Sequence, residues 1–354
     1  MQIRFHHLLK IRFTGSRRRL LDLIVSEYPN FIVPESGTGE AADLEVFFGP
    51  FDEEALGSKH PFFHYRYGAG IVSETKRYKT AKWKVALSSL DNPPARLHFD
   101  GNRSSEIFFI GEILEPLLRY LLVRKGALLL HSSCVATPAG SVLISGIRHT
   151  GKTLLMMEAL ARGASLLSDD YTFVSAENEA FCYPKKVNLF VTHFCEIESL
   201  KEVWNRLPLA DRLRMRFFNF VRRVTRDYMV LGYQKFLTEL LPQVTIQNSA
   251  PLKKIVLLTR QPTSAFAVRR NLDPRETAAK LAANNQWECN TFQRMLLAYR
   301  YGNPTGGPSE WIAREEELLA TIASRTVASE IVIPDFSPDN LHRLLSAARE
   351  EIFE

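Results

Sequence analysis

One octapeptide near the middle of the chain has the residue types and spacing of a phosphate-binding loop. Residues 146–153 read Gly-Ile-Arg-His-Thr-Gly-Lys-Thr and satisfy the pattern G-x-x-x-x-G-K-[ST]. The glycines let backbone N–H groups point at oxyanions, and the following helix adds positive potential at its first turn. Lys152 can then reach terminal phosphates, and the Thr153 hydroxyl can bind Mg²⁺. The residues expected to bind the nucleotide are Gly146, Ile147, Arg148, His149, Thr150, Gly151, Lys152, Thr153 and Leu154.

The residues around the loop favour this interpretation over a chance match. A random chain of this composition contains such a match with odds of roughly one in a hundred. Residues 142–144 form a β-type run before the loop, and residues 154–162 form a helix-forming run after it. Strand, glycine loop and helix is the context that the motif requires. The loop interior is bulky, and Arg148 and His149 either touch phosphate or substrate or face solvent.

Two adjacent aspartates follow at a spacing that returns the chain to the loop. Gly163 suits the end of the helix, and residues 164–168 then form a short strand that stops at Asp169 and Asp170. A helix of about 11 residues rises roughly 16 Å, and a strand of about six residues returns roughly 20 Å. The crossover makes the second strand parallel to the first, so its end lies beside the loop. One carboxylate can bind Mg²⁺ and the other can accept a proton from a hydroxyl, whereas the plainer alternative is a solvated turn.

The elements that position these residues belong to an α/β chain with two expected domains. Residues 1–103 show short extended segments, punctuated by glycine and proline, and one helix near 17–26, typical of a small β-rich α/β module. Residues 104–354 are expected to form the catalytic domain. Its expected elements are a helix at 105–124, a hairpin of strands at 127–135 and 141–145, a basic helical insertion at about 198–241, a strand at 252–259, helices at 274–284 and 311–323, a strand at 330–333 and a helix at 338–353.

Charge and cysteine usage exclude several classes of protein. The 354 residues include 45 Lys and Arg against 39 Asp and Glu, and the net charge of +6 suits phosphates or an acidic partner but not nucleic acid. The cysteines show no C-x-x-C pair, so a disulfide framework or a zinc site is not expected. They are Cys134, Cys182, Cys195 and Cys289.

The most apolar long stretch, 107–123, does not have the composition of a membrane span. It carries Glu112, Glu115 and Arg119 at helical spacings, which a bilayer would not tolerate, so we expect a buried amphipathic helix. The N-terminus has no uninterrupted apolar region and no small-residue cleavage site. These features predict a cytoplasmic protein without a membrane partner.

The segment from Leu130 through the loop to Asp170 resembles the catalytic core of the HPr serine kinase/phosphorylase family and of the wider group of HPr-kinase-like proteins, some of which modify ribosomally made peptides. It includes Leu130-His-Ser-Ser-Cys-Val-Ala136, the glycine loop and Ala161-Arg-Gly-Ala-Ser-Leu-Leu-Ser-Asp-Asp170. The resemblance implies a P-loop kinase core related to phosphoenolpyruvate carboxykinase, with ATP and Mg²⁺ as cofactors. It also implies phosphoryl transfer to a serine-type hydroxyl.

Individual residues match the family's pattern at the expected positions. Lys152 and Thr153 match its phosphate and metal positions, and His131 matches the histidine at the edge of its site. Asp169 and Asp170 match its base and metal-linked pair, and we expect Thr153 and Asp170 to hold the metal. The family's second signature, a glycine-containing stretch tied to phosphorylase activity and HPr docking, has no counterpart here. HPr as the acceptor therefore does not follow from the resemblance, and a homo-oligomer stays open.

Three further groups of basic residues are weaker candidates. Lys185 and Lys186 follow a predicted strand and either hold the transferred phosphate or are simply exposed. The basic stretch is either a docking or lid element for an acidic peptide or phosphorylated ligand, or a solvated face over the core. It holds Lys201, Arg206, Arg212, Arg214, Arg216, Arg222, Arg223, Arg226 and Lys235. Arg260 ends a buried strand and could reach the site.

The function expected from these residues is a Mg²⁺–ATP-dependent kinase acting on a Ser/Thr hydroxyl of a peptide or protein. Positioning and charge stabilisation account for most of such catalysis, so few other groups are required. Two alternatives stay open: a kinase for a small hydroxyl compound, and a nucleotide-binding regulatory protein without catalysis. The aspartate pair favours an enzyme, since a pure binder needs no positioned base.

Overall fold

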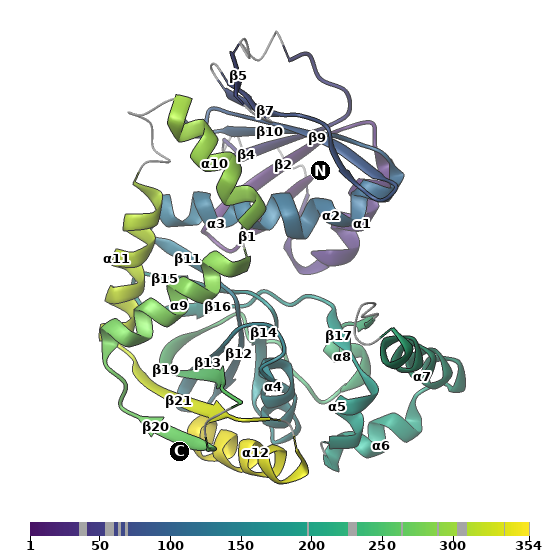
Figure 1. The fold of residues 1–354 in the computed structure, drawn as a ribbon, viewed down its shortest axis with the longest axis vertical. Coiled ribbons are helices and arrows are strands. Elements are labelled where there is room, and N and C mark those ends of the chain that lie inside the picture. The colour runs from purple at the N-terminus through teal and green to yellow at the C-terminus, as the bar shows by residue number, and fades with distance from the viewer. Residues whose placement is uncertain are drawn as a thin grey trace. The chain divides into compact units, whose positions relative to one another are not determined.

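The computed structural model divides the chain into two compact units, whose elements are labelled in Figure 1. The residues described are 1–34, 41–53, 60–62, 65–67, 70–196, 198–225, 232–262, 265–288, 290–302, 310–335 and 337–353. Unit 1 comprises Met1–Leu129 and Gln286–Leu318, and unit 2 comprises Leu130–Asn285 and Leu319–Glu354. The domain boundary expected after residue 103 does not coincide with this division, because residues 104–129 and 286–318 belong to unit 1.

Unit 1 is built on a mixed sheet of the order β3-β1-β2-β4-β10-β9-β7-β6-β5, with β8 beside β9. Alternate residues of β10 are buried, as expected of a strand with one face on the core. The strands are β1 (Gln2–Phe5), β2 (Leu9–Gly15), β3 (Ile32–Val33), β4 (Leu44–Phe48), β5 (His60–Phe62), β6 (Tyr65–Tyr67), β7 (Gly70–Ser73), β8 (Lys76–Tyr78), β9 (Ala81–Ser88) and β10 (Ala95–Gly101). The β-rich character predicted for this part is confirmed.

The helix expected at 105–124 is confirmed. It belongs to unit 1 because an aromatic side chain of the helix packs against the sheet of that unit. It runs through η2 (Arg103–Ser105), α2 (Glu106–Phe109), the π-helical η3 (Ile110–Leu114) and α3 (Glu115–Arg124). The Phe109 ring lies 5.1 Å from the Phe48 ring and 5.0 Å from the Phe99 ring. Arg119 is buried, and its charge is satisfied there because Nε donates a 2.6 Å hydrogen bond to Glu315. Further helices of this unit are α1 (Arg18–Glu27), η1 (Pro29–Phe31) and α10 (Asn290–Gly302).

Unit 2 contains a second mixed sheet, in which β13, β19 and β21 are parallel. Its strands are β12 (Ser132–Thr137), β13 (Gly140–Ser145), β14 (Ser165–Ser168), β15 (Thr172–Ser175), β16 (Glu179–Phe181), β19 (Ser249–Arg260), β20 (Ala267–Arg270) and β21 (Val327–Ile333). The strand expected at 127–135 is instead two strands, β11 (Ala127–Leu130) and β12, because the chain leaves extended pairing at His131. The predicted hairpin of β12 and β13 is confirmed.

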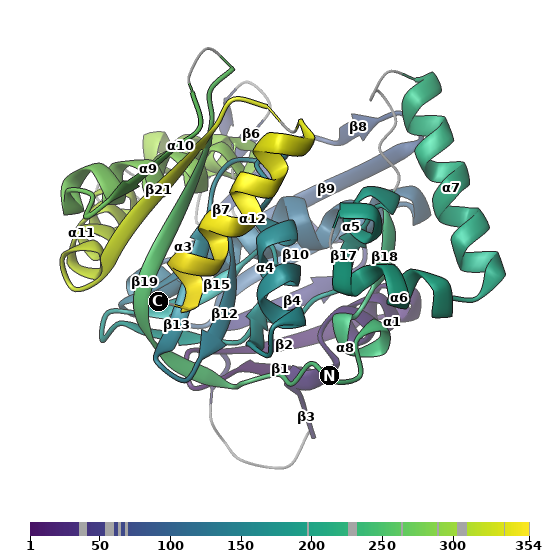
Figure 2. The same cartoon turned by 90° about the horizontal axis from the view of Figure 1, so that it is seen from below.

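Helices and a small two-stranded sheet complete unit 2. Strands β17 (Val187–Leu189) and β18 (Tyr233–Lys235) pair with each other. The helices are α4 (Lys152–Ala161), α5 (Val191–Glu196), α6 (Glu198–Arg206), α7 (Leu209–Val224), α8 (Leu237–Leu240), α9 (Pro274–Glu288), α11 (Trp311–Ser324) and α12 (Pro338–Phe353), of which α9 and α11 continue into unit 1. Apolar residues of α4, α12, β13 and β19 share one hydrophobic core, and Figure 2 shows α4 beside α12. The described part of the expected basic helical insertion forms α6, α7, β18 and α8, and Arg226 lies outside the described residues.

No helix in the described parts of the chain combines the length and the apolar composition that crossing a bilayer requires.

Candidate active site

The two glycines of the loop are required for different physical reasons. The loop joins β13 to α4, and β13 lies beside β19. A Cβ atom on Gly146 would lie 2.6 Å from the Leu258 carbonyl oxygen and 2.7 Å from Thr150 Oγ1, so a larger residue does not fit. Gly151 precedes the first residue of α4 with φ of 100°, which L-residues rarely adopt. The first glycine therefore permits close packing, and the second permits the turn into the helix.

The interior of the loop is more exposed than its ends. The side chains of Ile147, Arg148 and His149 are exposed, and His149 has φ of 65° in the left-handed region. Thr150 is buried, and its hydroxyl donates a 2.7 Å hydrogen bond to the Ile147 carbonyl. The Leu154 side chain packs into the hydrophobic core, so only the backbone of this residue is available to bind a phosphate.

Lys152 and Thr153 open helix α4 with their polar groups at the loop. The Lys152 side chain is largely buried, and its ammonium donates to the carbonyls of Gly146 at 2.6 Å and Ile147 at 3.3 Å. The first turn of α4, all of it described, contains no acidic residue, and no side chain caps the helix. The loop end of the helix is therefore electropositive, as anion binding requires.

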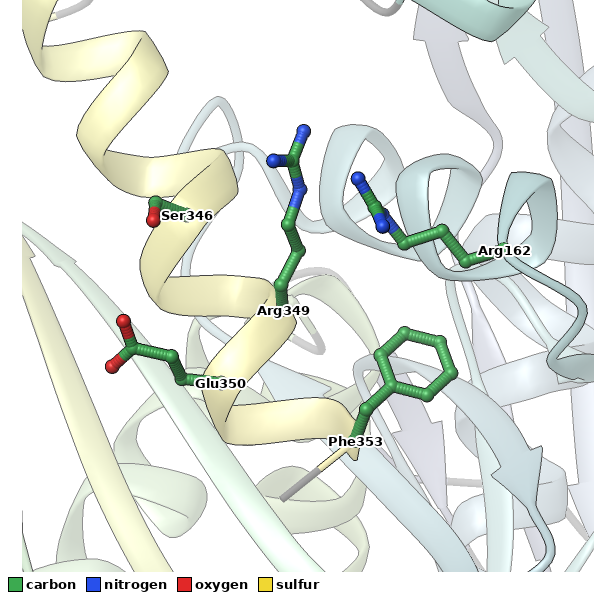
Figure 3. Close-up of a pocket in the computed structure, with 5 residues that line it drawn as sticks. All are labelled: Arg162, Ser346, Arg349, Glu350 and Phe353. Carbon is green, nitrogen blue, oxygen red and sulfur yellow. The ribbon is translucent and has the colours of Figure 1, made fainter.

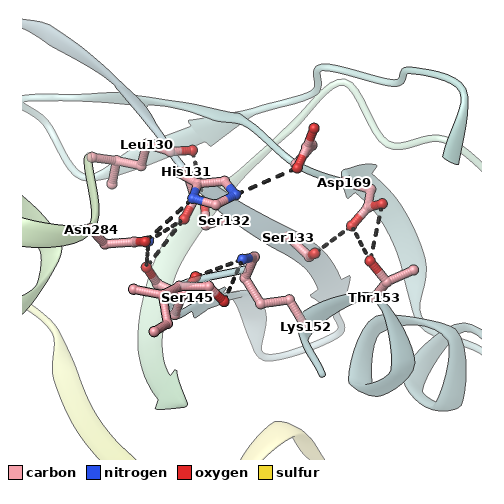
Figure 4. Close-up of polar contacts among 12 residues, drawn as sticks. Leu130, His131, Ser132, Ser133, Ser145, Lys152, Thr153, Asp169 and Asn284 are labelled. Carbon is pink, nitrogen blue, oxygen red and sulfur yellow. Dashed lines mark hydrogen bonds and ion pairs between the residues drawn. The ribbon is translucent and has the colours of Figure 1, made fainter. Parts of the chain in front are cut away.

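Strand β14 delivers the acidic pair to this helix end. Strand β12 lies between β13 and β14 and is antiparallel to both, so β14 runs parallel to β13, as the crossover argument predicts. Ser168 is paired with Cys134, and Asp169 follows directly. The Thr153 hydroxyl lies 3.3 Å from each carboxylate oxygen of Asp169 (Figure 4). The return of the second strand to the loop thus has the expected geometry.

Asp169 is the inner member of the pair. It is buried, and the Ser133 hydroxyl donates a 2.5 Å hydrogen bond to its Oδ1. Burial, followed by the neighbouring charge of Asp170, raises the pKa of Asp169, while the contacts with Ser133, Lys152 and Thr153 oppose this effect. The carboxylate next to Thr153 is therefore Asp169, whereas the sequence analysis expected Asp170 to share the metal with Thr153.

Asp170 is the outer member and has a different environment. Its side chain is 58% exposed, and its backbone adopts φ of 75°. Desolvation opposes the charged form, but the hydrogen bond from His131 and the charges of Lys185 and Lys152 hold the pKa of Asp170 below its usual range. Neighbouring carboxyls whose pKa values are shifted in opposite directions are suited to different roles in acid–base chemistry.

His131 lies where the strand breaks, and an asparagine orients its ring. Nε2 is 3.5 Å from Asp170 Oδ1. The Asn284 amide nitrogen donates to the His131 carbonyl at 2.8 Å and to Ser145 Oγ at 3.0 Å, which leaves its oxygen 3.3 Å from His131 Nδ1. The Asn284 oxygen therefore faces Nδ1, and Nε2 is the nitrogen that faces Asp170.

Asn284 and its neighbour Asn285 are site residues that the sequence analysis missed. Both are buried, and the Asn285 side chain accepts a 2.8 Å hydrogen bond from the His131 backbone N–H. They come from α9, more than 150 positions after His131. The only signal in the sequence is an adjacent pair of amides near the end of a predicted helix, which does not indicate a partner.

The remaining basic candidates differ in their distance from the site. Lys185 Nζ lies 5.7 Å from the centre of the Tyr171 ring, and its charge acts on Asp170. Lys186 instead lies over the Phe236 ring. Arg260, at the end of β19, is exposed, and its charge acts on Asp335. Lys185 is therefore the basic residue of this group that contributes to the site.

Metal binding here would depend on few protein ligands. The described residues contain no cluster of three or more His, Cys, Asp or Glu side chains that could hold an ion. Thr153 and Asp169 nevertheless offer oxygen ligands side by side, and Mg²⁺ commonly takes one or two protein ligands together with phosphate oxygens and water. The donor set is compatible with a magnesium–nucleotide complex.

A cavity elsewhere in unit 2 is separate from this site. It has a volume of about 360 Å³ and is lined by Arg162, Ser346, Arg349, Glu350 and Phe353 (Figure 3). Glu158 accepts hydrogen bonds from Arg162 and Arg349 beside it. This cavity lies past the C-terminal end of α4, roughly one helix length of 15 Å from the loop. It therefore does not line the phosphate site.

Comparison of the sequence with protein-family models and with curated proteins finds no match in either case.

Proposed function

We propose that this protein is a Mg²⁺–ATP-dependent kinase that transfers the γ-phosphoryl group to a Ser/Thr-type hydroxyl of a peptide or protein. The observation that carries the proposal is the contact of Thr153 with Asp169, which brings the first turn of α4 and the end of β14 together. An electropositive helix end and an adjacent carboxylate pair are the parts that phosphoryl transfer requires. The resemblance of residues 130–170 to the HPr-kinase-like core supports the same reaction.

The inner residues would hold the nucleotide and its metal. Loop N–H groups and Lys152 would bind the phosphates, with the Lys152 ammonium exchanging its carbonyl partners for phosphate oxygens. Thr153 and Asp169 would hold Mg²⁺, which supplies charge neutralisation at the phosphates. This assignment gives Asp169 the metal role that the sequence analysis gave to Asp170, because Asp169 is the carboxylate beside Thr153.

The outer residues would act on the acceptor. Asp170 is ionised at neutral pH, as an aspartate with a pKa at or below its usual range is, and its exposed side chain can reach a hydroxyl from solvent. The acceptor O–H gives its proton to Asp170 as its oxygen forms a bond to the γ-phosphorus. The bond from the γ-phosphorus to the bridging oxygen breaks, and ADP leaves with that electron pair. His131 orients Asp170, since its Nε2 lies 3.5 Å from Asp170 Oδ1.

The open position of Asp170 favours a large acceptor over a small one. A side chain that is 58% exposed is accessible to a serine or threonine carried on a peptide. A small hydroxyl compound stays the second candidate. Because Cys134 is a free thiol and ATP is the proposed donor, we propose that the reaction takes place in the cytoplasm.

The test is transfer from radiolabelled ATP to a panel of peptide, protein and small hydroxyl acceptors, compared between wild type and Asp170→Asn. We expect Asp170→Asn to bind ATP with nearly unchanged affinity and to lose transfer by about 10²- to 10⁴-fold, the usual contribution of a general base. Normal transfer by this variant would refute the role of Asp170. Tight ATP binding by wild type without transfer to any acceptor and without hydrolysis would instead support a regulatory nucleotide-binding protein.

A further inference from the structure

Helix α7 of unit 2 exposes its apolar side chains in a single stripe. Five large apolar residues are each between 54% and 64% exposed and follow one another at spacings of four, four, three and four. At about 100° per residue these positions fall within an arc of roughly 80°, and 16 residues extend over about 24 Å. The stripe consists of Leu209, Leu213, Phe217, Phe220 and Val224.

The stripe faces away from the body that anchors the helix. Met215, on the opposite side, is the residue of α7 that is buried in the core of unit 2. Within unit 2, α7 lies beside α5 and α6 in both Figure 1 and Figure 2. An amphipathic helix that only covers a core turns its apolar face inward. Here the apolar face points outward, so a solvated face over the core does not explain the pattern.

Arginines border the stripe on both sides. Arg214 lies about 60° beyond one edge of the apolar arc, and Arg216 lies about 20° beyond the other, with Arg223 next to it. All three side chains are exposed. Helix α7 as a whole carries five arginines against one aspartate, a net charge of +4. A cationic helix with exposed phenylalanines in its apolar stripe has the composition of helices that lie in the plane of a membrane surface.

We propose that α7 docks this protein onto an anionic lipid bilayer, with the apolar stripe at the acyl boundary and the bordering arginines at the level of the phosphates. Long arginine side chains can keep their guanidinium groups in the polar layer while their stems cover apolar surface. A second copy of the chain is disfavoured as the occupant, because two helices of charge +4 would repel each other along the stripe. An acidic peptide would meet the arginines but would leave the outward phenylalanines exposed unless it had an apolar face of its own.

Peripheral docking differs from the membrane span that the sequence argues against. The sequence analysis excluded a membrane partner because of the charges within residues 107–123. A helix that lies in the interface needs only one apolar face, and its charged residues contribute to binding. The proposal is also independent of the kinase assignment, since it rests on α7 alone.

The experiment is co-sedimentation of the full chain with vesicles of phosphatidylcholine alone and with vesicles that also contain phosphatidylglycerol. We expect wild type to bind the anionic vesicles about tenfold or more tightly than the neutral ones. Phe217→Ser combined with Phe220→Ser should lower binding to the anionic vesicles by about tenfold or more. Arg214→Gln, Arg216→Gln and Arg223→Gln together should remove the preference for anionic lipid.

Trp287→Ala is the matched control, because Trp287 is 73% exposed and lies on α9, outside the stripe. It should leave vesicle binding unchanged, and unaltered thermal unfolding of all variants would show that they fold. Equal loss with Trp287→Ala would overturn the proposal, as would absence of wild-type binding to anionic vesicles. Arginine-dependent binding of polyglutamate without vesicle binding, or a dimer that only the phenylalanine variant dissociates, would also overturn it.

Discussion

The candidate site has two halves, and each contains one aspartate: the aspartate of the inner half is buried, and that of the rim half is exposed. The inner half consists of Ser133, Lys152, Thr153 and Asp169. The rim half consists of His131, Asp170 and Asn284. Asp169 is buried with a raised pKa, and Asp170 is exposed with a lowered pKa, although the two residues are adjacent. Position at the strand end, and not residue type, separates the two: Asp169 contacts Thr153, and Asp170 is accessible from solvent.

Among the variants that test the difference between the two halves, Lys152→Ala is expected to have the largest effect, a loss of ATP affinity. Its ammonium lies across the loop, and charge-assisted hydrogen bonds contribute about 1.5–3 kcal/mol, so ATP affinity should fall roughly 10- to 100-fold. Lys185→Ala is the control, because the Lys185 charge acts on Asp170, and it should change ATP affinity by about threefold or less. Titration with a fluorescent nucleotide measures both, and unchanged affinity in Lys152→Ala would refute its assignment to phosphate binding.

An intermediate effect is expected for Asn284→Ala, which removes the partner of the His131 ring. We expect kcat to fall about 10- to 100-fold, since a small displacement of a catalytic group has a cost of this size, while KM for ATP stays near its wild-type value. Asn285→Ala is the neighbouring comparison, because Asn285 holds the His131 backbone and not its ring. Steady-state kinetics with both variants would contradict the rim assignment if Asn284→Ala raised KM for ATP and left kcat intact.

The smallest effect concerns stability and follows from the pKa of Asp169. Burial raises this pKa above the value in the unfolded chain, so the unfolded chain loses the proton first and stability falls as the pH rises between the two values. Asp169→Asn removes this penalty. We expect it to raise Tm at pH 7, with the difference shrinking towards pH 4.

Calorimetry across this pH range measures the effect, with Asp170→Asn as the matched control. Asp170 has a lowered pKa, so its charged form contributes to stability at neutral pH and its removal should not raise Tm. If Asp169→Asn had a lower Tm than wild type at pH 7, the buried Asp169 carboxylate would not be destabilising, and this prediction would be wrong.

Local sequence patterns predicted much of unit 2 but not the assembly of the site. The glycine loop, helix α4 and the return of β14 follow from residue spacing, because strand, turn and helix signals lie within 30 positions. The partners of His131 come from α9, and no local pattern could connect them. The pairing of Thr153 with Asp169 instead of Asp170 depends on which side chain the strand end directs inward. A helical pattern also reveals an apolar stripe in α7 but not that this stripe faces solvent.

The measurement that tests the central claim most directly is the Mg²⁺ dependence of ATP affinity in wild type, Asp169→Asn and Asp170→Asn. If the end of β14 and the glycine loop form one metal–nucleotide site, Mg²⁺ will tighten ATP binding in wild type and in Asp170→Asn but will have little effect in Asp169→Asn. An undiminished Mg²⁺ effect in Asp169→Asn, or no ATP binding by wild type, would contradict the account.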